Sequence, residues 1–349
     1  MKYGLWLPIF GGWLRNVEDE KMPATFEYAK EVIQSAEKWG YDTTLIAELY
    51  LNDIKGTDAD ALEAWSTAAA LAAVTEKIEI MTAVRPIYHN PAVIAKMAAN
   101  IDHISKGRFT LNIVSGWWAE EAKQYGGEFT EHDERYDRTT EFVEILKGLW
   151  ENDEFSYKGK FYEIENTKLQ PKPVQRPNPT LYAGGESEKG KQVITSLCDA
   201  YILHGHTPEE AKVKIDDMKE RRKKAGRGPF QSIGMAAYVI CRDTEEEAQA
   251  ELERITTVSD MSGYAGFKDF TSKSELEQKI QLQDYSVSNR GLRPNLIGTP
   301  EQIAEQILEF EKAGVDLLML QSSPQLEELE RFSNDVMPKV EELRAALSK

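Results

Sequence analysis

Phe109-Thr-Leu-Asn-Ile-Val-Ser-Gly-Trp-Trp118 is the stretch that decides the fold. Its apolar positions, among them Leu111 and Ile113, are typical of a buried strand, and a glycine ends the run. Asn112 and Ser115 are polar, although they stand at or near the carboxyl end of that strand. Ligands bind at this end of the strands in parallel α/β folds. The stretch therefore predicts a core strand that ends in a binding site.

A second polar stretch, Glu131-His-Asp-Glu-Arg-Tyr136, follows at a short distance and begins a long helix. His132, Arg135 and Tyr136 stand just before or inside the first helical turn. Side chains of these types at a helix start can meet a phosphate or a ring oxygen, and local capping is the alternative interpretation. We expect the two stretches to be consecutive ligand-binding units at one mouth of a barrel.

Eight predicted strands alternate with helices along the chain, and this order predicts a (β/α)8 TIM barrel. The strands are the quoted stretch together with residues 3–7, 43–47, 78–84, 180–183, 199–203, 233–241 and 317–320. We expect residues 1–349 to form a single domain with insertions at about 151–179, after strand four, and about 257–294, before strand eight. A doubly wound sheet competes, but no GxGxxG fingerprint follows the first strand.

The two insertions differ in composition. In the first, residues 155–162 favour a small hairpin that turns at 158–159, and the proline-rich segment 169–179 favours a rigid extended connection. The second insertion shows no clear alternation of polar and apolar residues, and its segment 286–293 has the character of a mobile loop. The regular pattern then returns, since Thr299, Pro300 and Gln302 predict a capping-box helix start.

Arg290 and Arg293 lie in the second insertion. Arginines on a flexible loop near a barrel mouth suit a lid that clamps an anionic group and excludes water. A solvated basic loop is the alternative interpretation of the same residues.

The composition excludes several classes of partner. The formal net charge of −17 argues against nucleic acid and against an anionic membrane surface. No stretch approaches the roughly 18 unbroken apolar residues of a membrane span, and no signal peptide is visible. Cys198 and Cys241 are too few for a disulfide scaffold and have no CxxC spacing. We therefore expect a cytoplasmic protein.

The fifth predicted strand runs into Ala183-Gly-Gly-Glu-Ser-Glu-Lys-Gly-Lys-Gln192. Glycines let backbone N–H groups approach a ligand, a serine hydroxyl donates, and the helix start favours an anion. Gly185 and Ser187 therefore predict a phosphate cradle, with an ordinary strand-to-helix turn as the alternative. A nucleotide P-loop is excluded because Gln192 stands where the Mg²⁺-binding hydroxyl is required.

The histidines offer further candidates at the barrel mouth. His89 follows strand three, where it either faces a substrate or is structural, and His204 and His206 follow strand six. No set of His, Asp or Glu residues has convincing metal spacing, so we expect no metal site. Neither a GxSxG elbow nor another nucleophile motif is found.

Several motifs occur in the same order as in the bacterial luciferase-like flavin-dependent monooxygenases, and the chain resembles this family over almost its whole length. The motifs are Asn112–Trp117, Glu131–Tyr136, Leu169–Pro173, Gly184–Ser187 and Asn295–Gln302. Within the family the chain is most similar to the alkanesulfonate and dimethylsulfone monooxygenases. Its start, in Gly11–Leu14 and Met22–Phe26, also resembles the pyrimidine ring-opening monooxygenase.

The resemblance implies a two-component monooxygenase. Such enzymes take reduced FMN (FMNH2) from a separate NAD(P)H:FMN reductase and use O2, through a C4a-(hydro)peroxyflavin, to oxygenate a small substrate. The sulfur members cleave a carbon–sulfur bond and release an aldehyde with sulfite or a sulfinate. We also expect a homo-oligomer, either a dimer or a tetramer.

Carried over by position, the resemblance also implies roles for single residues. Together with the residues found from the strand and helix ends, the expected cofactor-binding set is Glu48, Asn112, Ser115, Glu121, His132, Arg135, Tyr136, Gly185 and Ser187. The expected catalytic set is His89, Tyr238, Arg290 and Arg293. Glu186 and Glu188 flank the phosphate cradle, so phosphate binding there must use backbone donors rather than net charge.

Departures from the family pattern bear on the substrate. The alkanesulfonate enzymes carry a Cys after strand two and an Arg-x-His pair on strand seven, where this chain has Ala61, and Ala236 with Tyr238. The loss of that Arg and His favours a neutral substrate such as a sulfone, although Arg85 and the loop arginines can compensate. We further hypothesise that residues 257–294 close over the reduced flavin. The alternatives are a pyrimidine-type or other small-molecule flavin monooxygenase, an F420-dependent dehydrogenase and a non-catalytic flavin-binding protein.

Overall fold

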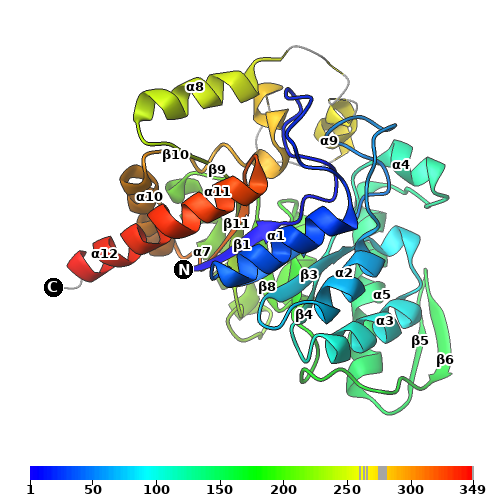
Figure 1. The fold of residues 1–349 in the computed structure, drawn as a ribbon. Helices are drawn as coiled ribbons and strands as arrows, with labels where there is room; N and C mark the ends of the chain where they lie inside the picture. Colours follow the sequence, from blue (N-terminus) through cyan, green and yellow to red (C-terminus); the bar gives the residue numbers. More distant parts are fainter. Residues whose placement is uncertain (259–260, 262–263, 265, 274–280, 348–349) are drawn as a thin grey trace.

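The computed structural model describes residues 1–258, 261, 264, 266–273 and 281–347. Eight parallel strands close into a barrel (Figure 1). In order around the barrel they are β1 (Lys2–Trp6), β2 (Thr43–Ile46), β3 (Glu79–Val84), β4 (Phe109–Ile113), β7 (Leu181–Ala183), β8 (Ala200–Leu203), β9 (Ile233–Cys241) and β11 (Leu317–Gln321). Pairing of β11 with β1 closes the ring. The predicted (β/α)8 TIM barrel is confirmed.

Helices surround the barrel (Figure 1). They are α1 (Phe26–Lys38), α2 (Ala64–Ala73), α3 (Pro91–Ile104), α5 (His132–Glu151), α6 (Glu188–Leu197), α7 (Pro208–Lys224), α8 (Glu245–Thr256), α10 (Pro300–Ala313), α11 (Gln325–Arg331) and α12 (Met337–Leu347). The predicted capping box at Thr299 and Gln302 is confirmed. A π-helical turn over Phe332–Val336 joins α11 to α12. No helix in the described part of the chain is long and apolar enough to span a membrane.

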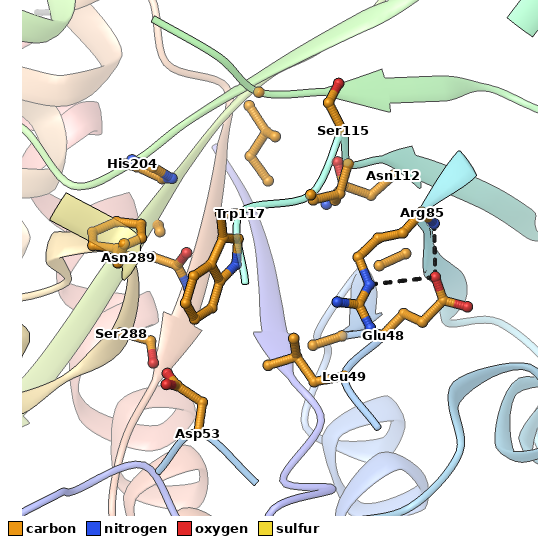
Figure 2. A pocket seen from close by; sticks show the side chains of 18 of the residues that line it. Glu48, Leu49, Asp53, Arg85, Asn112, Ser115, Trp117, His204, Ser288 and Asn289 are labelled. Atoms are coloured by element: carbon orange, nitrogen blue, oxygen red, sulfur yellow. Dashed lines mark hydrogen bonds and ion pairs between the residues drawn. The ribbon is translucent and has the colours of Figure 1, made fainter. Parts of the chain in front are cut away.

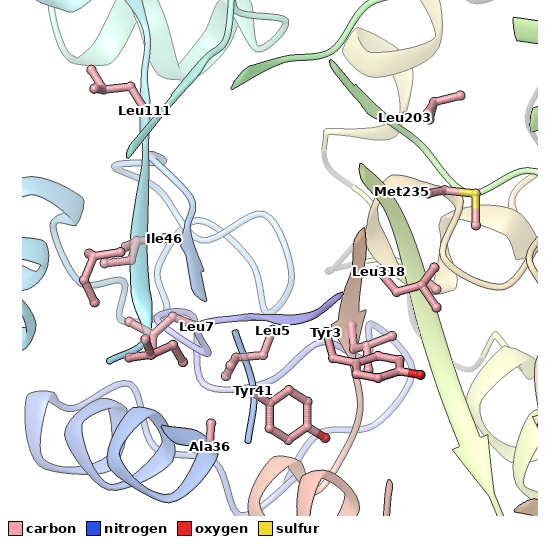
Figure 3. Packing of buried hydrophobic residues seen from close by; sticks show 14 of the residues in the cluster. Tyr3, Leu5, Leu7, Ala36, Tyr41, Ile46, Leu111, Leu203, Met235 and Leu318 are labelled. Atoms are coloured by element: carbon pink, nitrogen blue, oxygen red, sulfur yellow. The ribbon is translucent and has the colours of Figure 1, made fainter. Parts of the chain in front are cut away.

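The core has two layers because each barrel strand is covered on both faces. A small cluster that includes Leu45, Met81 and Met319 fills the barrel interior. A larger cluster lies between the strands and the helices, where Leu5 of β1 and Ala36 of α1 are fully buried (Figure 3). Because side chains on both faces of each strand are buried, the strand sequences are largely apolar runs.

The first insertion contains the expected hairpin, formed by β5 (Phe155–Lys158) and β6 (Glu163–Thr167). The second strand of this hairpin begins after the predicted segment 155–162 ends. The short elements that were not predicted include one helix and one strand outside the second insertion's loop. The helix α4 (Ala119–Gln124) follows β4, and the strand β10 (Leu296–Gly298) pairs with the outer half of β9.

The second insertion lies over the carboxyl ends of the strands, beside the loop that follows β1 (Figure 1). Its described parts include α9 (Phe267–Lys273) and two 3-10 turns, Gln283–Ser286 and Ser288–Arg290. The alternative of a solvated basic loop over 286–293 is wrong for Arg290, which is only 2% exposed. Part of the insertion that was expected to close over the flavin, at 259–260, 262–263, 265 and 274–280, lies outside the described residues.

Gly205, after β8, holds the 3-10 turn at 288–290 against the barrel. Its backbone N–H donates to the carbonyl oxygen of Asn289 at 2.8 Å. A Cβ atom at Gly205 would lie 2.1 Å from the carbonyl oxygen of Arg290. The absent side chain therefore allows this close approach of two backbones.

We expect Gly205→Ala to lower the free energy of unfolding by about 1–3 kcal/mol, because the added methyl group overpacks this contact. Gly228→Ala is the matched control, since no atom lies within 4 Å of a Cβ at that position. Urea denaturation of the two variants measures the difference. Equal stability of both variants would contradict the close packing of 288–290 on the barrel.

Candidate active site

A cavity of about 250 Å³ opens at the carboxyl ends of the barrel strands. Residues from both predicted ligand-binding stretches line it. Of the nine residues expected to bind the cofactor, eight contribute to its wall, namely Glu48, Asn112, Ser115, His132, Arg135, Tyr136, Gly185 and Ser187. Because the carboxyl ends of the parallel strands meet at one mouth, residues that follow β2, β4 and β7 lie together with residues at the start of α5. Figure 2 shows Glu48, Arg85 and Asn112 on one side of this pocket, with His204 and Asn289 facing them.

The ninth residue, Glu121, lies behind the wall and acts through Arg85. The Arg85 guanidinium, which lines the pocket, forms an ion pair with the fully buried Glu121 carboxylate. Glu48 accepts a hydrogen bond from the Arg85 backbone N–H at 2.7 Å and contacts His89 Nε2 at 2.6 Å. Burial alone would lower the pKa of Arg85, but the adjacent Glu121 and Glu48 raise it above its usual value. Arg85 therefore stays charged, and His89 stands behind Glu48 rather than in the wall.

A phosphate cradle is predicted in the turn after β7, where a serine N-cap and two glycines lie at the start of α6. Ser187 is the N-cap of α6, and its Oγ accepts from the Gly190 N–H at 3.1 Å, which leaves the hydroxyl hydrogen to be donated. A Cβ at Gly185 would lie 2.9 Å from the Tyr136 hydroxyl oxygen, and one at Gly190 would lie 2.8 Å from it. Both glycines are therefore needed for Tyr136 to lie against the helix start.

The acidic residues that flank the cradle are held by cations. Glu186 forms an ion pair with Arg290, and Glu188 pairs with Arg221 at 2.8 Å. Burial of Glu186 opposes its ionisation, but a hydrogen bond from His206 and the nearby positive charges outweigh burial and hold its pKa well below the usual range. The negative charges of Glu186 and Glu188 beside the predicted phosphate cradle are thus compensated. These two residues therefore do not oppose the binding of a phosphate there.

His204 lines the pocket and is linked to the same ion pair. Arg290 donates to His204 Nδ1 at 2.8 Å. Burial, together with the Arg290 charge, lowers the pKa of His204 to about 3. The imidazole is therefore neutral at physiological pH.

A further ion pair joins Arg15, in the loop after β1, to Asp53. Burial raises the pKa of Asp53, while Arg15 and the Tyr285 hydroxyl oppose this rise. The Arg15 guanidinium also lies 4.0 Å from the centre of the Tyr285 ring. Arg15 and Asp53 both line the pocket, so this wall too carries a balanced pair of charges.

Aromatic side chains cover the mouth. Trp117 stacks on Trp118 with ring centres 5.5 Å apart, and Phe270 of α9 meets the edge of Trp117 at 5.5 Å. Phe270 also approaches His204, at 6.4 Å between ring centres. The second insertion therefore supplies an apolar side chain to the pocket and limits the access of water.

The four expected catalytic residues do not line the pocket. His89 lies behind Glu48 and Arg290 behind Glu186, so each reaches the wall only through its partner. Arg293 is bound to Glu210 at 2.7 Å. Tyr238 is buried outside the cavity wall, where β9 turns from β11 to β10.

Several wall residues were not in the expected site sets. Arg85 and Gln321 stand at the carboxyl ends of β3 and β11, so the rule that found Asn112 could have found them. Trp117 lay inside the quoted stretch. Arg15 and Phe270 come from irregular segments, where the sequence has no periodicity that places a side chain. No cluster of three or more His, Cys, Asp or Glu side chains within the described ranges could hold a metal ion.

Known proteins resemble this chain in both sequence and fold. The family model for luciferase-like monooxygenases matches residues 1–317. A protein of Pseudomonas putida named FMNH2-dependent dimethylsulfone monooxygenase is 36% identical over 98% of this chain and 96% of its own length. A protein of the same name from Pseudomonas fluorescens (strain Pf0-1) is 34% identical over 99% and 96%.

A crystal structure of a riboflavin lyase with modified FMN and riboflavin superposes with a TM-score of 0.84. It covers 98% of this chain and 91% of the lyase, at 22% sequence identity, so this likeness concerns the fold alone. The family match spans all residues that line the pocket except Gln321. The chain therefore belongs to the luciferase-like monooxygenase family, as the motifs along its sequence predicted.

Proposed function

We propose that the protein is the oxygenase component of a two-component system that oxidises a small, uncharged organosulfur compound with reduced FMN and O2. Dimethyl sulfone is the first candidate substrate. The names of the two relatives support the cofactor and the substrate class, since both are called FMNH2-dependent dimethylsulfone monooxygenases. The charge distribution of the pocket is the structural observation that carries the choice of an uncharged substrate.

Reduced FMN fits the half of the pocket built by β2, β4 and β7. Ser187 and the α6 N-terminus offer a hydroxyl donor and free backbone N–H groups to the phosphate. Asn112 is 7% exposed, and its Oδ1 has no hydrogen-bond partner among the described residues, so it can accept from a ring N–H. Arg135 and Tyr136 complete this side of the wall. Since the reductant has to be supplied, we propose a separate NAD(P)H:FMN reductase as the partner.

The other half of the pocket offers little to an anion. Arg15 and Arg85 are already bound to carboxylates, and Arg290 is bound to Glu186 behind the wall. Ala236 lines the pocket at the position where the alkanesulfonate enzymes are expected to carry an arginine. A buried anion without a free counter-ion loses hydration at a cost on the order of several kcal/mol. A neutral sulfone does not bear this cost.

The reaction is balanced as follows. Reduced FMN supplies two electrons and two protons, one atom of O2 is transferred to the substrate, and the other leaves as water. Oxygenation of one methyl carbon of dimethyl sulfone breaks the carbon–sulfur bond and yields formaldehyde and methanesulfinate. The residues of the chain hold the phosphate, orient the substrate and exclude water through Trp117 and Phe270.

A coupled assay tests the proposed reaction. We expect the protein, with an FMN reductase, NADH and O2, to convert dimethyl sulfone to formaldehyde and methanesulfinate, and to convert methanesulfonate at less than about a tenth of that rate. Free FMN and NADH without the reductase should give no product. Turnover of methanesulfonate or uracil in preference to the sulfone would contradict the proposal.

Phosphate binding is tested by comparing two flavins. Ser187→Ala should weaken FMN binding roughly threefold to tenfold, because one hydrogen bond to the phosphate is lost. The same variant should bind riboflavin, which lacks the phosphate, as the wild type does. Quenching of flavin fluorescence gives both dissociation constants. A parallel loss for riboflavin would show that Ser187 acts on the fold of α6 rather than on the phosphate.

Charge selection is tested at Ala236. Ala236→Arg places in the pocket a cation that has no carboxylate partner of its own, so methanesulfonate should bind at least about tenfold more tightly than to the wild type. Ala236→Gln is the matched control, since it adds a long side chain without charge. Isothermal titration of the FMN-loaded proteins measures the affinities. If both variants bind methanesulfonate with the same affinity, the charge of the pocket does not select the substrate.

A further inference from the structure

Three residues with side-chain nitrogen donors line the pocket at the ends of strands between β8 and β1. Trp6 ends β1, Gln321 ends β11, and His204 follows β8. The strands that carry them are neighbours in the barrel, in the order β8, β9, β11 and β1. Ala236 of β9 lies between them and brings only a methyl group. This small residue adds no polar group to the wall between β8 and β11.

Gln321 is a buried donor for which the protein provides no acceptor. The residue is 1% exposed, and its Nε2 has no hydrogen-bond partner within the described part of the chain. The same holds for Trp6 Nε1. Buried polar groups in folded proteins are nearly always satisfied, and those left open at a cavity are candidates for contact with a ligand. Both residues line the pocket, so their unsatisfied N–H groups favour a ligand that accepts hydrogen bonds.

His204 adds a donor whose direction is fixed by Arg290. A guanidinium can only donate, so the Nδ1 atom that receives the Arg290 bond must carry the lone pair. The neutral ring therefore bears its hydrogen on Nε2. Figure 2 shows the His204 ring at the pocket, on the side of Asn289. The Glu186–Arg290 ion pair holds this tautomer from behind.

We propose that Trp6 Nε1, His204 Nε2 and Gln321 Nε2 form a donor wall that binds the oxygen atoms of a neutral sulfonyl group. This inference rests on the proposed function and names the residues that select its substrate. A sulfone has two strongly accepting oxygens and no donor, so it matches a wall that offers N–H groups without net charge. A thioether, which lacks these oxygens, leaves the buried donors unsatisfied and is rejected.

Binding and turnover are measured separately on the FMN-loaded protein. Dimethyl sulfone and dimethyl sulfide are titrated while the broadening of their methyl proton resonances is followed by NMR, and KM and kcat come from the coupled assay. Gln321→Leu and His204→Phe remove one donor each at similar size, and His204→Gln restores an N–H donor. Gln249→Leu, on the exposed face of α8, is the control. The FMN dissociation constant and the thermal midpoint report the integrity of each variant.

We expect Gln321→Leu and His204→Phe to raise the dissociation constant and KM for the sulfone roughly tenfold, with kcat and FMN binding changed less than about threefold. Sulfide binding should not weaken, and His204→Gln should recover most of the sulfone affinity. If the wild type oxygenates the sulfone and these variants keep its KM, the donor wall is wrong while the proposed function stands. If the wild type binds the sulfone through these donors without oxygenating it, the proposed function is wrong and the donor wall stands. A wild type that does not bind the sulfone overturns both.

Discussion

The ion pair between Arg290 and Glu186 connects the parts of the molecule that build the site. Glu186 belongs to the turn after β7, where the phosphate cradle is proposed, and Arg290 belongs to the second insertion. Removal of Glu186 would leave the buried Arg290 charge without its carboxylate partner, and loss of one partner of a buried pair destabilises proteins by about 3–5 kcal/mol. The same guanidinium fixes the tautomer of His204, so one side chain compensates the acidic turn, anchors an irregular segment and orients a donor.

The barrel and half of the site were predictable because both follow from regular backbone. Strand ends in a parallel barrel meet at one mouth, so the polar residues Asn112 and Ser115 after an apolar run placed the pocket correctly. The same rule applied to Gly185 and Ser187. It requires only the order of strands and helices, which hydrophobic periodicity supplies.

The remaining half depended on contacts that periodicity does not encode. Arg290 and Arg293 were expected to face a ligand, but each is bound to a glutamate that lies at least 83 residues away in the chain. Tyr238 follows the inward-facing Ala236 by two residues, so strict alternation would bring it into the pocket. The switch of β9 from β11 to the unpredicted strand β10 instead leaves it buried outside. Local sequence patterns contain neither the partner of an ion pair nor the bend of a strand.

The balance of charges around the cavity also bears on what happens after the reaction. The proposed substrate is neutral, whereas the sulfinate that it yields is an anion. Because Arg15, Arg85 and Arg290 are already bound to carboxylates, the cavity gives the new anion no strong counter-ion to hold it. The molecule as a whole carries a formal charge of −17, and its field repels anions. A pocket that offers no free counter-ion to an anion would thus favour departure of the proposed anionic product.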